Sequence, residues 1–212
     1  MSGAATPAVV FDFGAVLFQW RPLELLQACV PELARDEALA RALAAQVFES
    51  FTPASDWARF DLGELAEDEL AARIAARVGV QPAQVRRIID AIPPHLQPQP
   101  ATVALLQRVR AAGHRLYYLS NMPRPYADHL ERENAFVAQF ADGIFSGRVG
   151  LMKPDADIFA LAERRFALDP PRTLLIDDHA GNTAAAQARG WQAHTFTSAD
   201  EAGHALRAAG WL

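Results

Sequence analysis

The feature that most constrains the fold of this chain is a regular alternation of short apolar runs and helical segments after residue 100. The runs HRLYYLS, GIFSGRVG, RTLLIDD and WQAHTFT predict extended segments at 114–120, 143–150, 172–178 and 191–197. Segments with helical spacing lie around them at 101–113, 124–136, 155–168, 181–190 and 199–210. Strands joined through helices pair in parallel, so the alternation predicts an α/β fold with a Rossmann-like, doubly wound parallel sheet.

The first apolar run, AVVFDF at 8–13, predicts a buried strand that a long helical insertion separates from the others. Helices are predicted over 34–50, 64–80 and 82–92. The four prolines of PPHLQPQP at 93–100 predict a non-helical connector. We assign 1–18 and 97–212 to a core domain and 19–96 to a helical cap. Open α/β sheets bind ligands at the carboxyl ends of their strands, so an insertion that begins there is expected to cover the site.

Composition and charge exclude several classes of partner. The formal net charge is -5 without any run of like charges, which gives no nucleic-acid footprint. No apolar stretch approaches the roughly 18 residues of a transmembrane helix, and the N-terminus lacks the basic and apolar regions of a signal peptide. Cys29 is the only cysteine, and its apolar helical surroundings predict a buried structural thiol. We expect a cytoplasmic protein without a nucleic-acid or membrane partner.

Polar residues stand at the ends of three predicted strands and in one loop before a helix. They are Asp12, Ser120 with Asn121, Asp177 with Asp178, and Lys153 in LMKPDADIF. Each has an ordinary structural explanation when taken alone, as a turn cap, a helix N-terminal residue or a solvated lysine. Parallel strands bring their carboxyl ends to one edge, so the joint occurrence of these groups predicts a site at that edge.

The motifs VVFDFGAV, LYYLSN, LMKPD and LLIDDHAGN resemble, in type and order, the signature of the haloacid dehalogenase (HAD) superfamily. The family pattern is a nucleophilic Asp after an apolar strand, then Ser or Thr, then Lys, then an acidic pair. The insertion is similar to the small helical cap of subfamily I, and FDLGELAEDEL at 60–70 resembles a helix start found in such caps. The resemblance implies a capped, Rossmann-like hydrolase.

The resemblance also implies catalytic roles. Asp12 would attack phosphorus and form an aspartyl-phosphate, which divides one difficult step into two. Ser120, Asn121 and Lys153 would bind the phosphoryl oxygens, and Ser120 and Lys153 would act as catalytic groups by stabilising charge.

A magnesium site follows from the same resemblance. Asp12, the backbone carbonyl of Gly14 and Asp178 would hold Mg²⁺, which prefers hard oxygen ligands and keeps several waters. Asp177 would hold a metal-bound water, or it would contact the metal-binding residues without contacting the metal itself.

Gly14 departs from the commonest form of the pattern. Most phosphatases of the superfamily carry a second Asp at this place, which protonates the leaving alkoxide and later activates water. Such help is typically worth about 10²–10⁴ in rate. DFGAV is similar to a D-x-G-x-V branch that includes phosphatases of sugar phosphates such as glucose 1-phosphate, whose anomeric leaving group needs less protonation. In this interpretation a water, His179 or a cap group replaces the missing acid.

A 2-haloacid dehalogenase is the main enzymatic alternative. Asp12 would then be the nucleophile without a metal, because halide departs without a proton. The acidic pair at 177–178 disfavours this alternative, since its natural use is Mg²⁺ binding.

A catalytically silent binding or regulatory domain is the second alternative. Loss of a catalytic acid at Gly14 fits this interpretation. A silent domain, however, has no need to keep Asp12, Ser120, Lys153 and Asp178 together.

We therefore predict an Mg²⁺-dependent phosphomonoester hydrolase that acts on a small phosphorylated metabolite, such as a sugar phosphate, through an aspartyl-phosphate. Candidate contacts for the leaving group, in or beside the cap, are Phe18, Trp20, Trp57, Phe60 and Asp61. For the aromatic residues, packing within the cap is the competing explanation.

Overall fold

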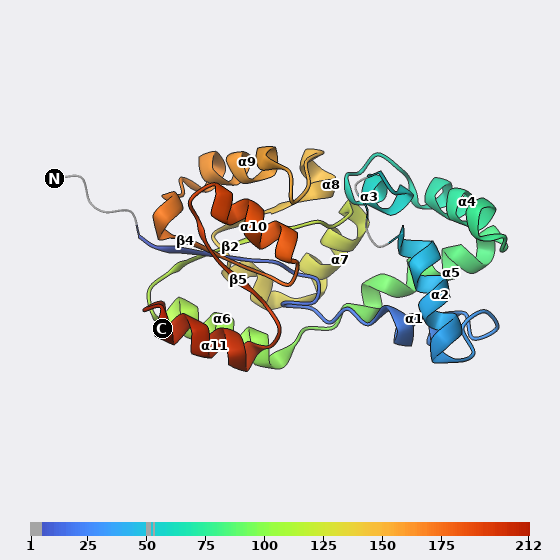
Figure 1. The fold of residues 1–212 in the computed structure, drawn as a ribbon, viewed down its shortest axis with the longest axis horizontal. Coiled ribbons are helices and arrows are strands. Elements are labelled where there is room, and N and C mark those ends of the chain that lie inside the picture. Colours follow the sequence, from blue (N-terminus) through green and yellow to red (C-terminus); the bar gives the residue numbers. More distant parts are fainter. Residues whose placement is uncertain (1–5, 50–51, 53) are drawn as a thin grey trace.

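A computed structural model describes residues 6–49, 52 and 54–212. Within them, five strands form one sheet in the order β3-β2-β1-β4-β5. The strands are β1 (Ala8–Phe11), β2 (Arg115–Ser120), β3 (Asp142–Phe145), β4 (Thr173–Asp177) and β5 (Gln192–Thr195). All neighbours are parallel, which confirms the predicted α/β fold. Because β1 pairs with both β2 and β4, the carboxyl ends of these three strands lie together (Figure 1).

Helices cover both faces of the sheet. The main covering helices are α6 (Pro100–Ala111), α9 (Ala156–Phe166), α10 (Ala180–Ala188) and α11 (Ala199–Ala208). Figure 1 shows α9 and α10 on one face and α6 and α11 on the other. Successive side chains of a strand point to opposite faces, so Val10 packs with Phe159 of α9, while Val9 belongs to the cluster that contains Leu105 and Leu206. Burial on both faces explains the apolar runs of the central strands, AVVF in β1 and LLI in β4, whereas the edge strand β5 is more polar and more exposed.

Two core segments differ from the sequence-based boundaries. The segment 143–150 is extended only as far as Phe145, and α8 (Ser146–Val149) follows at once. The helix predicted over 124–136 is α7 (Arg124–Glu133), followed by a 3₁₀ turn at Ala135–Gln139. Asn134 ends α7 because its backbone is extended, and its side chain donates to the Leu130 carbonyl at 2.9 Å. A second 3₁₀ turn, Pro170–Arg172, precedes β4.

A group of helices lies beyond the carboxyl ends of the strands (Figure 1). They are α1 (Pro22–Cys29), α2 (Glu37–Phe48), α3 (Asp56–Asp61), α4 (Glu67–Val78) and α5 (Pro82–His95). Their apolar sides repeat every three or four residues, as in Leu70 and Ile74 of α4 and Val85, Ile88 and Ile92 of α5, all of which are buried. These helices occupy the segment predicted as the cap.

The prediction of a non-helical connector over 93–100 is partly wrong, because α5 continues through Pro93 and Pro94 to His95. Pro93 has no N–H to donate to the carbonyl of Ile89, which would be its partner one turn earlier. The hydroxyl of Tyr126, on α7, donates to that carbonyl at 3.0 Å instead. A hydrogen bond from the core thus compensates for the bond that the proline cannot make.

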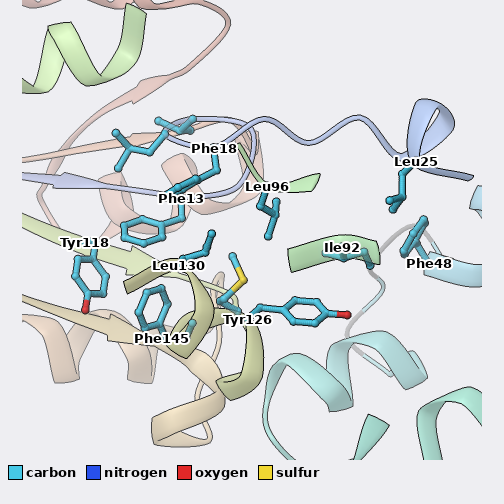
Figure 2. Packing of buried hydrophobic residues seen from close by; sticks show 14 of the residues in the cluster. Phe13, Phe18, Leu25, Phe48, Ile92, Leu96, Tyr118, Tyr126, Leu130 and Phe145 are labelled. Carbon is cyan, nitrogen blue, oxygen red and sulfur yellow. The ribbon is translucent and has the colours of Figure 1, made fainter. Parts of the chain in front are cut away.

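The two connections between the core and the cap are bonded to each other. Gln19 N donates to the carbonyl of Gln97 at 2.9 Å, and Gln99 N donates to the carbonyl of Leu17 at 2.8 Å. One apolar cluster also runs from the sheet into the cap (Figure 2). Its labelled members include Phe13, Phe18, Leu96, Ile92, Leu25 and Phe48. The cap therefore packs on the core through a shared hydrophobic interior.

Two expectations based on composition can be compared with the structure. Within the described ranges, no helix combines the length and the apolar character needed to cross a membrane. Cys29, predicted to be buried, is only partly buried at the end of α1, and this burial raises the pKa of its thiol.

Tyr126→Phe is expected to destabilise the protein by about 1–3 kcal/mol, because it leaves the buried carbonyl of Ile89 without a donor. Urea unfolding followed by circular dichroism measures the change. The matched control is Tyr118→Phe, which removes a hydroxyl bound to Glu131. Glu131 keeps its bonds to Arg148 after that change, so a smaller loss is expected. Equal losses in the two variants would contradict the proposed compensation.

Candidate active site

The carboxyl ends of the central strands gather most of the polar residues singled out from the sequence. Asp12 follows β1 directly, and its N–H donates to the Ile176 carbonyl of β4 at 2.9 Å, which extends the ladder and brings Asp12 beside Asp177. Ser120 is the last residue of β2. A cavity of about 240 Å³ opens over these strand ends, and its lining includes Asp12, Gly14, Asn121, Lys153, Asp178 and His179.

Lys153 bridges two carboxylates at the floor of the cavity. Its Nζ lies 3.1 Å from Asp12 Oδ2 and 2.5 Å from Asp177 Oδ2, and 1% of its side chain is exposed. Burial disfavours the charge, but the carboxylates of Asp12 and Asp177 outweigh it and raise the pKa of Lys153. Lys153 therefore carries a fixed positive charge next to the Asp12 carboxyl group.

The Asp12 carboxyl group is held in one orientation beside the cavity. Its Oδ1 accepts from the N–H of Phe13 at 2.7 Å, which fixes the orientation of the carboxyl group. Burial raises the pKa of Asp12 to about 7, while the positive charge of Lys153 opposes that rise. The Ser120 hydroxyl acts in the same direction as Lys153, and Ser120 is 1% exposed behind the cavity floor.

Asp177 is fully engaged by protein donors. Its Oδ1 accepts from His179 N and from Asn182 Nδ2, each at 2.9 Å, and its Oδ2 faces Lys153. These contacts leave Asp177 as the group that holds Lys153 in place.

Asn121 is engaged through its side chain as well. Its Nδ2 donates to the Lys153 carbonyl at 2.9 Å, and its Oδ1 accepts from Lys153 N at 2.8 Å. The side chain thus clamps the loop that carries Lys153, which leaves the backbone N–H of Asn121 as its candidate donor to a phosphoryl oxygen.

The acidic residues at the strand ends fit a divalent cation. Asp12, Asp177 and Asp178 each offer one oxygen, and these oxygens all lie within 4.8 Å of one another. Because Asp177 is taken up by Lys153, Asn182 and His179, the carboxylates open to the cavity are Asp12 and exposed Asp178. Two carboxylates with room for waters match the ligand set that Mg²⁺ prefers.

The roof of the cavity is mainly apolar. Of the five cap candidates, Trp20, Trp57 and Asp61 line the cavity, whereas Phe18 and Phe60 are buried in the packed interior. Further lining residues that sequence analysis did not select include Ile92, Leu96, Met122, Tyr126 and Met152. Met122 directly follows Asn121 and Met152 directly precedes Lys153, so their places beside the motifs were a usable signal.

A family model for haloacid dehalogenase-like hydrolases matches residues 6–190 of the chain. The match spans strands β1 to β4 and all the cap helices, and it ends before β5. The chain therefore belongs to the haloacid dehalogenase-like hydrolases.

Individual relatives share only a low sequence identity with this chain. The sesquiterpene phosphatase astK of Aspergillus oryzae is 26% identical over 184 residues, which is 86% of each chain. The HAD family enzyme bt-2542 of Bacteroides thetaiotaomicron, solved with magnesium and inorganic phosphate, has a TM-score of 0.66 at 22% identity, over 91% of this chain and 95% of that one. The L-2-haloacid dehalogenase of Xanthobacter autotrophicus, with chloropropionic acid covalently bound, has a TM-score of 0.67 at 18% identity, over 98% and 85%. These two structures show that the fold is shared.

Proposed function

We propose that the chain is an Mg²⁺-dependent phosphomonoester hydrolase that works through an aspartyl-phosphate. The observation that carries the proposal is the Asp12–Lys153–Asp177 contact at the cavity floor, with Asp178 open beside it. An Asp12 oxygen attacks phosphorus and the phosphorus–ester oxygen bond breaks, so that the alcohol leaves with a proton. Water then attacks phosphorus, which releases inorganic phosphate and restores Asp12.

The floor residues stabilise charge during both steps. Lys153 is close enough to Asp12 to neutralise a phosphoryl oxygen bound there, while the N–H of Asn121 donates to another. Ser120 lies behind the floor, where its hydroxyl acts on the Asp12 carboxyl group. Asp12, the Gly14 carbonyl and Asp178 would hold Mg²⁺, which when bound would add positive charge near the phosphoryl group. The acidic pair at 177–178 favours this function over metal-free dehalogenation.

The roof of the cavity favours an apolar leaving group over a sugar. Burying a sugar hydroxyl without a partner is costly. The hydroxyl of Tyr126 already donates to Ile89, and the neighbouring roof residues Ile92, Leu96 and Trp57 present mostly apolar surface. Similarity to a sesquiterpene phosphatase points the same way. We therefore place phosphates of hydrocarbon alcohols ahead of glucose 1-phosphate as substrates.

A chain-length series of alkyl phosphates tests the substrate class. Each methylene buried contributes about 0.8 kcal/mol, so kcat/KM is expected to rise by up to about 200-fold from n-butyl to n-octyl phosphate, which differ by four methylenes. Phosphate release is measured with Mg²⁺ and with EDTA, and EDTA is expected to remove the activity. Glucose 1-phosphate is the matched polar substrate, and a higher kcat/KM for it would contradict the apolar assignment. Halide release from 2-chloropropionate that resists EDTA would replace the phosphatase with a dehalogenase.

A further inference from the structure

A carboxyl group in the roof of the cavity has no role in the steps described so far. Asp61 is the last residue of α3, is 6% exposed, and lines the same cavity as Asp12. In the described part of the chain, no hydrogen bond or ion pair engages its side chain, and the bond from the core goes to its backbone carbonyl. A buried carboxyl group without a protein partner, facing the site from the cap, calls for a function.

The core holds Asp61 in place. Ser146 Oγ donates to the Asp61 carbonyl at 2.6 Å and accepts from Met122 N at 2.8 Å, so one hydroxyl ties the end of α3 to the residues after β2 and β3. Gly63 has φ +79°, and a Cβ there would lie 2.8 Å from the Gly147 carbonyl oxygen. This close approach requires glycine and docks the end of α3 against the core.

The floor of the cavity lacks a proton donor at the place nearest the nucleophile. Gly14 lines the cavity but offers only backbone, and a Cβ built on it meets no atom within 4 Å. Lys153 is held by two carboxylates, and the Tyr126 hydroxyl already donates to Ile89. A leaving alkoxide in this cavity therefore needs a donor from elsewhere.

Three other titratable residues line the cavity, and each is less suited to donate a proton. Asp155, Asp178 and His179 are all exposed at its mouth, where water reaches them, and Asp178 is also a candidate metal ligand. His179 accepts from Gly181 N through Nδ1 at 3.2 Å. Burial, by contrast, raises the pKa of Asp61 to about 8, and the negative charge of Asp12 adds to the rise. Asp61 thus keeps its proton near neutral pH.

We propose that Asp61 is the general acid–base residue of the phosphatase reaction, supplied by the cap in place of a side chain at position 14. The inference rests on the proposed function. As the phosphorus–ester oxygen bond breaks, the Asp61 carboxyl gives its proton to the departing oxygen and becomes a carboxylate. In the second step that carboxylate takes a proton from the water that attacks the aspartyl-phosphate, and Asp61 is protonated again.

Asp61→Asn tests the proposal through its dependence on the leaving group. The variant is compared with the wild type on p-nitrophenyl phosphate and on the alkyl phosphate that the wild type hydrolyses fastest, both with Mg²⁺. A phenolate leaves without protonation, so kcat/KM for p-nitrophenyl phosphate, which reports the steps up to release of the leaving group, is expected to fall less than about tenfold. The kcat/KM for the alkyl phosphate is expected to fall by about 10²–10⁴. Burial disfavours a charged Asp61, so an unfolding midpoint at least equal to that of the wild type serves as the folding control.

A second variant places a carboxylic acid at position 14, on the floor of the cavity, in a chain that lacks the Asp61 carboxyl group. Adding Gly14→Asp to Asp61→Asn is expected to recover part of the alkyl phosphate activity, because the side chain has room at that position. Equal losses on the two substrates without recovery would overturn the role of Asp61. Wild-type activity on p-nitrophenyl phosphate but on no alkyl phosphate would overturn it too and leave the phosphatase proposal standing. Activity on neither substrate would overturn both.

Discussion

Asp12→Asn is expected to lower phosphate release by about 10⁴–10⁶-fold, the range seen when a covalent catalytic group is removed. An asparagine cannot form the acyl phosphate, although its Oδ1 can still accept from the N–H of Phe13. Lys153 keeps its ion pair with Asp177, so the fold is expected to persist. Release of inorganic phosphate under single-turnover conditions measures the loss, and near-UV circular dichroism checks the fold.

The matched control is Asp200→Asn, the same chemical change at an exposed residue in the first turn of α11 that does not line the cavity. Its activity is expected to equal that of the wild type. Intact-protein mass spectrometry should accompany both assays, because deamidation of the introduced asparagine would regenerate the nucleophile. Turnover by Asp12→Asn at a rate near the wild type, with the asparagine intact, would rule out the covalent mechanism.

Lys153→Met is expected to cost both stability and activity. The change leaves the buried carboxylates of Asp12 and Asp177 without their shared cation, and breaking a buried pair in this way costs about 3–5 kcal/mol. For a chain of this size, that loss corresponds to a fall of roughly 6–20 °C in the unfolding midpoint. Thermal unfolding in EDTA measures the effect of the lysine without compensation by a bound cation.

A double variant separates the two consequences. Lys153→Met combined with Asp177→Asn removes one of the two carboxylates along with the cation, so part of the stability is expected to return while phosphate release stays absent. An unfolding midpoint for Lys153→Met equal to that of the wild type would show that the bridge contributes nothing. Recovery of activity in the double variant would show that the charge of Lys153 is dispensable.

Lys153 also stands out in the composition. It is the only lysine among the 20 Lys and Arg residues of the chain. An ammonium is a compact point charge, whereas a guanidinium is planar and larger. A site that places one cation between Asp12 and Asp177, with 1% of its side chain exposed, suits the smaller group. This explains a lysine here in a chain that otherwise uses arginine.

Donation of the proton from α3 links catalysis to the position of the cap. Asp61 reaches the cavity because Ser146 and Gly147 of the core receive the end of α3. An open cap would separate Asp61 from Asp12 and leave the floor without an acid. Proton transfer to the leaving group would then require the closed arrangement.

The sequence by itself determined the class of the fold and most of the floor of the site. Alternation of apolar strands with helices predicts a parallel sheet, and residues that directly follow such strands meet at one edge whatever the strand order. Asp12, Ser120 and Asp177 could therefore be assigned to one site from sequence alone, and the structure brings them together. Local patterns suffice here because strand direction fixes where each end lies.

Only the tertiary structure decided what surrounds that floor. Three features depend on contacts between segments distant in sequence. They are the position of β1 between β2 and β4, the ion pairs of Lys153 with Asp12 and Asp177, and the presence of Asp61 in the lining of the cavity. The helical continuation through Pro93 depends on Tyr126 in the same way, since the compensating hydroxyl comes from another element. Helical periodicity in a sequence indicates that one face of a helix is buried. Which other helix or strand covers that face depends on the packing of the whole chain.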